Sequence, residues 1–233
     1  MVIAAIITAA GSGLRLGPGD PKAQRMVRGL PLFVYSLRTL CANQLIDHIV
    51  VVVRSDAVDE VKDFIAHDPI AGPSSTEVNV VAGGATRQES VALGLASMDA
   101  GVDHVLVHDA ARALVPAEVV EAVIARLMDG ALAVVPVIEV TDTIRSQVDA
   151  SLGVVVDRNS LRSVQTPQGF TREVLVRAHQ SVGVAATDDA SLVEALGVQV
   201  VGVNGSPEAF KITYPTDLIF AEALIDQQEA GSQ

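Results

Sequence analysis

A loop of small residues, flanked by two cations, follows the first apolar run of the chain. Residues 2–8, VIAAIIT, are rich in isoleucine and predict a buried β-strand. Small residues dominate residues 9–19, so backbone N–H groups there can approach a ligand closely. Arg15 and Lys22 flank the glycines. A strand that runs into a bare, cation-flanked loop is suited to holding the phosphates of a nucleoside triphosphate.

Two common nucleotide motifs do not fit this loop. Gly11 and Gly13 match the dinucleotide pattern G-x-G-x-x-G, but Leu16 occupies the position of its third glycine. The P-loop requires G-K-[ST], which does not occur in the chain. The loop is therefore either a nucleotide site of another type or a plain turn between a strand and a helix.

Composition indicates a single α/β domain spanning residues 1–233. Hydrophobic residues make up 49% of the chain and aromatic residues only 3%, so the core must be aliphatic, as in a parallel sheet covered by helices. The net charge of −12 argues against general nucleic-acid binding, which requires a basic face. An acidic protein that binds an anionic ligand must gather its few cations locally.

The sequence indicates a cytoplasmic protein. It has no run of 18 apolar residues and no basic N-terminal region, so we expect neither a membrane span nor a signal peptide. The single cysteine, Cys41, excludes an internal disulfide and fits a reducing compartment.

Strand and helix patterns alternate over the first 137 residues, which predicts a mostly parallel twisted sheet with helices on both faces. Expected strands lie at residues 2–8, 46–53, 78–82, 102–107 and 131–137. Expected helices lie at residues 32–42, after Ser55, after Thr86 and from Pro116 to Met128. The polar loops at 9–22, 83–90 and 108–112 each follow a strand, so they should meet at one edge of the sheet, where ligands bind.

The regular alternation of strand and helix patterns ends after residue 137. Residues 139–159 contain two β-like pieces around a polar turn, which predicts a projecting hairpin arm. Residues 165–170 indicate a turn with Pro167. The expected remainder is a loop at 71–76, helices at 172–181 and from 187, a strand at 198–203, an extended piece at 210–213, and an amphipathic helix from Pro215 to about Gln228.

Nine short motifs follow one another along the chain: AAGSGLR (9–15), PK (21–22), GGxxRxxS (83–90), HDAAR (108–112), DT (142–143), DRN (157–159), QTPQ (165–168), TDDAS (187–191) and FKIT (210–213). Together they resemble the 2-C-methyl-D-erythritol 4-phosphate cytidylyltransferases of the non-mevalonate isoprenoid pathway. The resemblance implies a Rossmann-like nucleotidyltransferase fold. It also implies transfer of CMP from CTP to the methylerythritol phosphate, with release of pyrophosphate.

The resemblance assigns residues to two ligands. For CTP it implies backbone or side-chain contacts from Ala9, Ala10, Gly11, Gly13, Arg15, Lys22, Gly83, Gly84, Arg87, Ser90, Asp109 and Ala110. For the acceptor it implies Asp109, Arg112, Thr143, Arg158, Thr166, Thr187 and Lys211. Arg15, Lys22, Arg158 and Lys211 are the expected catalytic cations, because the attacking phosphate is already anionic and the reaction needs positioning and charge neutralisation.

No metal-ligating residue is assigned, since Mg²⁺ is expected on the CTP phosphates and on water. We interpret His108 as a packing residue, and Asp188 and Asp189 as helix-capping residues. The resemblance further implies a homodimer in which the arm at 139–159 completes the partner's site.

Two alternatives stay open. Ribitol-5-phosphate cytidylyltransferases share several of the motifs, and a nucleotide-binding regulatory module would need only one ligand. Three departures from the family pattern also stand out. Thr8 and Ala113 replace common prolines, and Ala85 replaces a common acid. We assign Ala85 no role.

Overall fold

The computed structural model describes residues 1–11, 13–17, 21–67, 76–181 and 186–231, and within these ranges it leaves out the side chains of Leu14 and Lys22. The loop expected at 71–76 lies outside the described residues except for Thr76. None of the described helices is long and apolar enough to cross a membrane.

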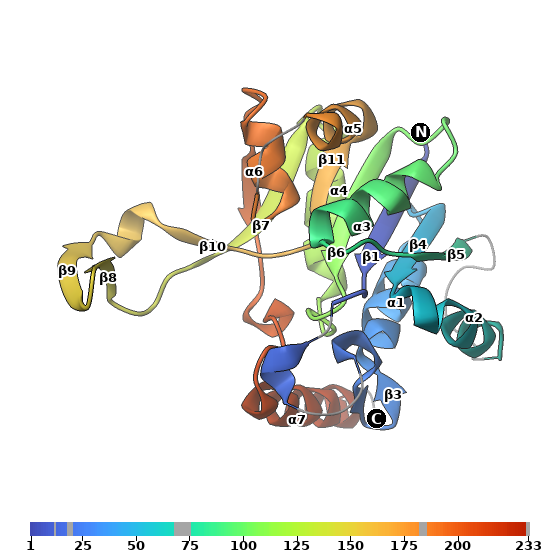
Figure 1. Ribbon diagram of the computed structural model, residues 1–233, viewed down its shortest axis with the longest axis horizontal. Coiled ribbons are helices and arrows are strands. Elements are labelled where there is room, and N and C mark those ends of the chain that lie inside the picture. The colour runs from blue at the N-terminus through green and yellow to red at the C-terminus, as the bar shows by residue number, and fades with distance from the viewer. Residues whose placement is uncertain (12, 18–20, 68–75, 182–185, 232–233) are drawn as a thin grey trace.

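A mixed sheet forms the centre of the fold (Figure 1). Its described strands lie in the order β10-β7-β11-β6-β1-β4-β5, with β12 also paired to β7. Six of them run in one direction: β1 (Ile3–Thr8), β4 (His48–Val53), β5 (Glu77–Ala82), β6 (His104–Asp109), β7 (Ala133–Glu139) and β12 (Val201–Asn204). The two that run oppositely are β10 (Arg162–Val164) and β11 (Gln168–Thr171). The predicted α/β class is confirmed.

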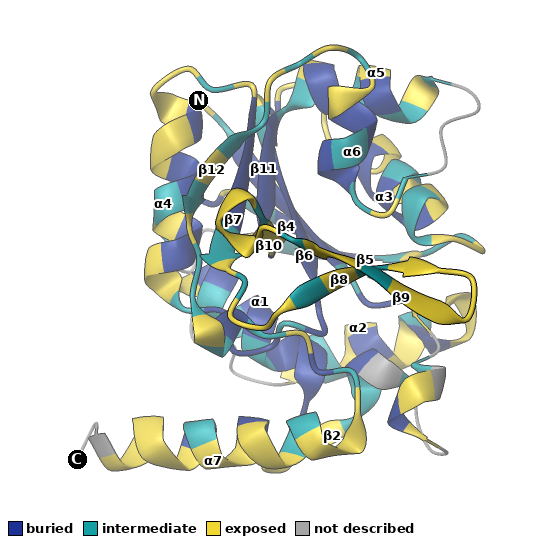
Figure 2. Cartoon of the chain, turned by 90° about the vertical axis from the view of Figure 1, so that its left-hand side faces the viewer, coloured by how far each residue is buried: buried dark blue, intermediate teal, exposed yellow. Residues whose placement is uncertain are grey.

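Helices cover both faces of the sheet, and for this reason the strands are apolar on both sides. Successive residues of β1 alternate between two core clusters, with Ala5 and Ile7 in one and Ala4 and Ile6 in the other. The first cluster includes residues of α1 (Leu32–Ala42), α2 (Val58–His67) and α4 (Ala117–Met128). The second includes residues of α3 (Arg87–Ala96), α5 (Arg172–Gln180) and α6 (Asp189–Glu194). Figure 2 shows the central strands buried between these layers.

Strand β11 corrects the turn expected at residues 165–170. A cis Thr166–Pro167 peptide bond precedes β11, and the strand then inserts antiparallel between β6 and β7. A Cβ atom on Gly169 would lie 2.6 Å from Val123 and 2.8 Å from Leu127, so α4 packs closely over this strand. The sequence did not reveal β11 because only four residues, beginning directly after a proline, form it.

A two-stranded hairpin lies between β7 and β10. It consists of β8 (Ile144–Val148) and β9 (Ser151–Val156), and Figure 1 shows it extended away from the main sheet. Leu152 and Val154 are 73% and 76% exposed, so no apolar partner from the described part of the chain covers the arm at those positions.

Two further helix boundaries differ from expectation. A 3-10 turn at Ser55–Ala57 precedes α2, so Ser55 does not cap it directly. The last helix, α7, runs from Pro215 to Gly231, and it is less amphipathic than predicted. Ala221 and Ile225 pack into a small third cluster, whereas Ile219 and Phe220 are exposed. Figure 2 shows that much of α7 is exposed.

Candidate active site

A cavity of about 610 Å³ opens at the carboxyl ends of β1 and β6 and beside the loop after β5. The polar loops meet there, as the strand-end argument predicted. Its lining residues are Thr8, Ala9, Ala10, Gly11, Gly13, Arg15, Ala23, Gly84, Ala85, Thr86, Arg87, Ser90, Asp109, Ala110, Ala111, Lys211 and Thr213. The described segments therefore bring together eleven of the residues assigned from the sequence.

Two of the residues assigned to CTP stand apart from that list. Gly83 lines a neighbouring cavity of about 440 Å³ that shares Ala10, Gly84 and Ala85 with the first. The side chain of Lys22 is not among those that the structure describes, so its assignment stays a prediction. The backbone of Lys22 begins a 3-10 turn, Lys22–Gln24.

Glycines allow the loops to approach one another. A Cβ atom on Gly83 would lie 2.8 Å from the Cβ atom of Ala10 and 2.8 Å from Oγ of Ser90, so no larger residue fits without movement. Gly13 has a φ of +66°, a backbone conformation that residues other than glycine rarely adopt. The backbone of these loops is consequently able to line part of the cavity wall.

The hydroxyl of Ser90 holds the loop before α3. It donates to the carbonyl oxygen of Thr86 at 2.9 Å and accepts from the N–H of Gly84 at 3.2 Å. Thr86 caps α3 and forms a reciprocal capping box with Glu89. These contacts fix the backbone of residues 83–86 along one side of the cavity.

Asp109 lies at the centre of the polar contacts. Its carboxylate accepts from Nζ of Lys211 at 2.7 Å, from Nε of Arg87 at 3.0 Å and from Oγ1 of Thr8 at 3.2 Å. Burial alone would raise the pKa of Asp109, but the two cations outweigh it and hold that pKa well below its ordinary range. The cavity therefore contains a fixed, ionised carboxylate.

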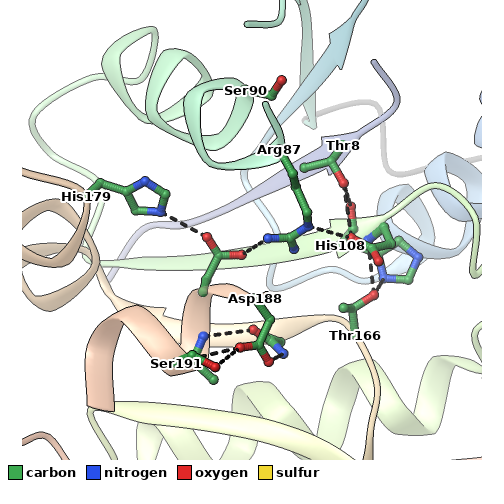
Figure 3. A network of polar contacts seen from close by, with 12 residues as sticks. Thr8, Arg87, Ser90, His108, Thr166, His179, Asp188 and Ser191 are labelled. Atoms are coloured by element: carbon green, nitrogen blue, oxygen red, sulfur yellow. Dashed lines mark hydrogen bonds and ion pairs between the residues drawn. The ribbon is translucent and has the colours of Figure 1, made fainter. Parts of the chain in front are cut away.

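Arg87 connects this carboxylate to a second one. Its Nη1 donates to Oδ2 of Asp189 at 2.6 Å, while Nε contacts Asp109. Burial lowers the pKa of Arg87, yet Asp189 and Asp109 reverse the effect and raise it above its ordinary value. Figure 3 shows Arg87 reaching from α3 toward Thr8 and His108, with His179 approaching from the other side.

The interpretation of Asp189 as a capping residue is wrong. Asp188 is the N-cap of α6, since its carboxylate accepts from the N–H of Ser191 at 3.0 Å. Asp189 is instead fully buried and paired with Arg87. The sequence held a signal for this: Asp189 lies three and four residues before Leu192 and Val193, on the apolar face of the helix.

The packing role of His108 is confirmed. Its side chain is fully buried, Nδ1 lies 3.0 Å from Oγ1 of Thr166, and Nε2 lies 3.2 Å from Oγ of Ser36. Burial lowers the pKa of His108 to about 4, so the ring is neutral at pH 7.

The residues assigned to the acceptor lie in three places. Asp109 and Lys211 face the cavity. Arg112 and Thr166 lie behind it: Arg112 donates to the carbonyl oxygens of Ala209 and Val164, and Thr166 accepts from the N–H of Asp109. Thr187 is exposed before α6, and Thr143 and Arg158 lie in the arm segment, outside the described cavity lining.

Comparison with known proteins identifies the family. The family model described as 2-C-methyl-D-erythritol 4-phosphate cytidylyltransferase (IspD) matches residues 3–227. A Streptomyces avermitilis protein of that name is 48% identical over 229 residues, covering 95% of this chain and 91% of the relative. The chain belongs to the 2-C-methyl-D-erythritol 4-phosphate cytidylyltransferase family.

Solved structures of this cytidylyltransferase family share the fold. The Anaerococcus prevotii 4-diphosphocytidyl-2C-methyl-D-erythritol synthase superposes with a TM-score of 0.83 at 29% identity, covering 97% of this chain and 98% of the other. The Thermus thermophilus 2-C-methyl-D-erythritol 4-phosphate cytidylyltransferase has a TM-score of 0.74 at 35% identity, covering 95% and 98%. The Rossmann-like nucleotidyltransferase assignment agrees with these structures, and the chain is a nucleotidyltransferase by family.

The cytidylyltransferase cavity supplies few ligands for a metal ion. Within the described ranges, no group of three or more His, Cys, Asp or Glu side chains is placed to hold one. Among the described lining residues, Asp109 is the one that carries a carboxylate, and both of its oxygens already contact cations. This donor set fits a divalent ion carried by phosphate oxygens, and not an ion held in a protein cage.

Proposed function

We propose that the cavity binds CTP and that the enzyme transfers CMP from it to 2-C-methyl-D-erythritol 4-phosphate, giving 4-CDP-2-C-methyl-D-erythritol and pyrophosphate. One observation carries this proposal: the bare loop with Arg15 and the Asp109–Lys211 pair line the same cavity of about 610 Å³. That volume lies within the usual range for small-molecule sites, roughly 300–1,000 Å³.

The reaction requires charge neutralisation more than covalent chemistry. An oxygen of the acceptor phosphate forms a bond to the α-phosphorus of CTP, and the bond from that phosphorus to the bridging oxygen of the β-phosphate breaks. Pyrophosphate leaves with the electron pair. Arg15, the N–H groups of Ala10, Gly11 and Gly13, and Lys22 as predicted from the sequence would hold the triphosphate. Lys211 would stabilise the charge that develops at the α-phosphate.

The base and the sugar would lie along the loops that glycines keep open. Ala10 and Gly11 offer backbone N–H groups to a pyrimidine and a ribose, whereas Ala9, Gly83 and Gly84 offer carbonyl groups, because their N–H groups already donate within the protein. Ser90 would contact the pyrimidine edge through its remaining lone pair, since its proton goes to Thr86. Asp109 retains free lone pairs for a hydroxyl of ribose or acceptor, and Ala110 would pack against the ribose.

We assign Mg²⁺ to the nucleotide phosphates. The bound ion would neutralise phosphate charge during transfer. The protein residues contribute by holding the phosphates: Arg15 and Lys211 from the cavity wall, and Arg87 by fixing Asp109.

The remaining acceptor contacts require a second subunit in this proposal. We infer a C2 homodimer whose arms, about residues 139–159, exchange and bring Thr143 and Arg158 to the partner's cavity. Arg112, Thr166 and Thr187 border the acceptor side. In support, an isolated two-stranded hairpin is marginal in water, and Leu152, Val154 and Val155 of this arm are exposed.

The free, buried thiol of Cys41 is in keeping with the cytoplasm as the location.

A pyrophosphate-release assay tests the function and its alternative. CTP with 2-C-methyl-D-erythritol 4-phosphate should give turnover that depends on a divalent ion. Ribitol 5-phosphate should give less, because the relatives named above carry the methylerythritol name. Faster turnover with ribitol 5-phosphate would assign the chain to the alternative, and equal turnover without any divalent ion would contradict the role of Mg²⁺.

A further inference from the structure

The buried carboxylate of Asp189 lies between Arg87, which lines the cavity, and His179, which is not among the lining residues. Asp189 is fully buried, and its Oδ2 accepts from Nη1 of Arg87 at 2.6 Å. Its other oxygen, Oδ1, lies 2.9 Å from Nε2 of His179 on α5. Only 4% of the His179 side chain is exposed, and its Nδ1 has no hydrogen-bond partner among the described residues. Nε2 is therefore the donor that faces Asp189.

These contacts form one continuous row. Lys211, Asp109, Arg87 and Asp189 alternate in charge, with His179 at the far end (Figure 3 shows Arg87 and His179). Because each carboxylate has a partner on both oxygens, the row has little freedom to rotate. A buried charge that loses a partner is strongly destabilised, so a change at Asp189 must be felt by Arg87.

The local structure of α6 does not require this carboxylate. Asp188 already caps the helix through the N–H and hydroxyl of Ser191, and it accepts from Nε2 of Gln168 at 2.8 Å. Asp189 makes its described side-chain contacts with α3 and α5 instead. Its position thus serves the guanidinium of Arg87.

We propose that Asp189 and His179 are positioning residues, which fix the Arg87 guanidinium and through it the Asp109 carboxylate that meets Lys211 and the substrates. His179 holds one oxygen of Asp189 so that the other faces Arg87. Without this support, Arg87 keeps Asp109 as its one remaining carboxylate partner and is free to shift it relative to Lys211. The activity test of this inference rests on the proposed function; the structural test does not.

A double-mutant cycle separates positioning from general stability. Asp189→Asn alone should lower kcat by about tenfold, the scale of coupling within one charged network, with a smaller change in KM for CTP. In an Arg87→Gln background the same change should have an effect of no more than about twofold, because its target is gone. Asp188→Asn is the matched control, and its effect should differ much less between the two backgrounds, because Asp188 makes no described hydrogen bond to Arg87 and interacts with it only through space. Equal effects of Asp189→Asn in both backgrounds would overturn the inference.

Two substitutions of His179 test the same positioning role while they leave the carboxylate of Asp189 in place. His179→Gln retains an N–H donor and should keep near-normal kcat, whereas His179→Leu should lower kcat toward the level of Asp189→Asn. Circular dichroism at the assay temperature verifies that both variants are folded. Equal loss of kcat in both folded variants would mean that the hydrogen bond to Asp189 has no positioning role.

An activity-free measurement distinguishes failure of this inference from failure of the proposed function. In ¹⁵N NMR of the intact protein, the Nε–H signal of Arg87, assigned by its loss in Arg87→Gln, should exchange slowly with solvent. It should exchange faster in Asp189→Asn and His179→Leu but not in Asp188→Asn. Unchanged exchange in Asp189→Asn and His179→Leu would refute the positioning role. A wild-type protein that releases no pyrophosphate would refute only the proposed function.

Discussion

Nζ of Lys211 lies 2.7 Å from the Asp109 carboxylate, although 102 residues separate them in sequence. Asp109 ends β6, and Lys211 follows a 3-10 turn, Pro207–Ala209, near the last helix. The Lys211 side chain is 42% exposed, so the ammonium group has a buried partner on one side and the open cavity on the other. This arrangement holds a positive charge at the edge of the cavity, where the proposed function needs one for a phosphate.

Replacing Lys211 with methionine should reduce kcat by a factor of about 10²–10³, comparable to the loss of one oxyanion-hole donor. The charge of Lys211 is expected to act on the transition state, so KM for CTP should change less. Steady-state kinetics with varied CTP tests this. A variant with normal kcat and a raised KM would show that Lys211 only binds the ground state.

Arg15→Ala and Lys22→Ala should each lower kcat strongly, by about 3–4 kcal/mol in activation free energy. Both changes remove positive charge expected at the triphosphate, and the fold should persist because Arg15 is exposed. Arg126→Ala is the control, since Arg126 lies on α4 and forms a loose pair with Asp129 at 3.8 Å. Loss of the thermal unfolding transition in Arg15→Ala would assign that residue to stability instead.

Stability should fall between pH 6.5 and about 4 because of His108. Its folded pKa, about 4, lies below the ordinary value of 6.5, so the unfolded chain binds more protons in this window. Unfolding free energy should therefore decrease on acidification, with a slope from this group of at most about 1.4 kcal/mol per pH unit.

Urea unfolding of the wild type and His108→Gln at several pH values measures the His108 contribution. Burial lowers the pKa of His104 as well, which acts in the same direction in both proteins, so the difference between them isolates His108. The variant should show the shallower slope. Parallel slopes would mean that His108 does not titrate in this window.

Gly83→Ala should raise KM for CTP and cost about 1–3 kcal/mol of stability, the usual effect of overpacking. The new Cβ atom would lie 2.8 Å from the Cβ atom of Ala10, another lining residue of the smaller cavity. Gly101→Ala is a suitable control because a Cβ atom there meets nothing within 4 Å. Isothermal titration with CTP checks binding. Equal affinity in the two variants would contradict the close approach of these loops to the nucleotide.

Mixed dimers test the exchange of arms. Arg158→Ala and Lys22→Ala chains, each nearly inactive alone, should recover part of the activity when refolded together. Recovery is expected because one of the two sites in a mixed dimer carries neither change. Differently tagged chains allow heterodimers to be purified before the assay. Purified heterodimers without activity would mean that each arm serves its own subunit, and a monomer in sedimentation would exclude the dimer.

Sequence patterns were sufficient where burial on both faces dictates apolar runs. The strands β1, β4 and β6 and the polar loops at their ends follow from such runs, which is why most assigned residues meet in one cavity. Strand β11 could not be predicted in the same way, because tertiary pairing on both sides compensates for a short sequence that contains Gly169.

The partners of the charged residues were less predictable than their location. A carboxylate in the first turn of a helix usually lies in solvent, so Asp189 resembled a capping residue. Its spacing to Leu192 and Val193 indicated burial, but its partner Arg87 comes from a helix 102 residues earlier, and no local pattern encodes such a contact. Arg112 and Thr166 are likewise occupied by the backbone of distant segments.

The arm leaves the main sheet and returns to it at two neighbouring, paired residues. Glu139 of β7 lies opposite Arg162 of β10, so the chain leaves and re-enters the body at two paired neighbours. Antiparallel neighbours of this kind can be joined by a two-residue turn. Residues 140–161 can thus lengthen or shorten without disturbing the strand order around the cavity. Under the proposed arm exchange, assembly would be encoded by the arm and nucleotide binding by the sheet-end loops, and only the arm residues Thr143 and Arg158 would have to serve both.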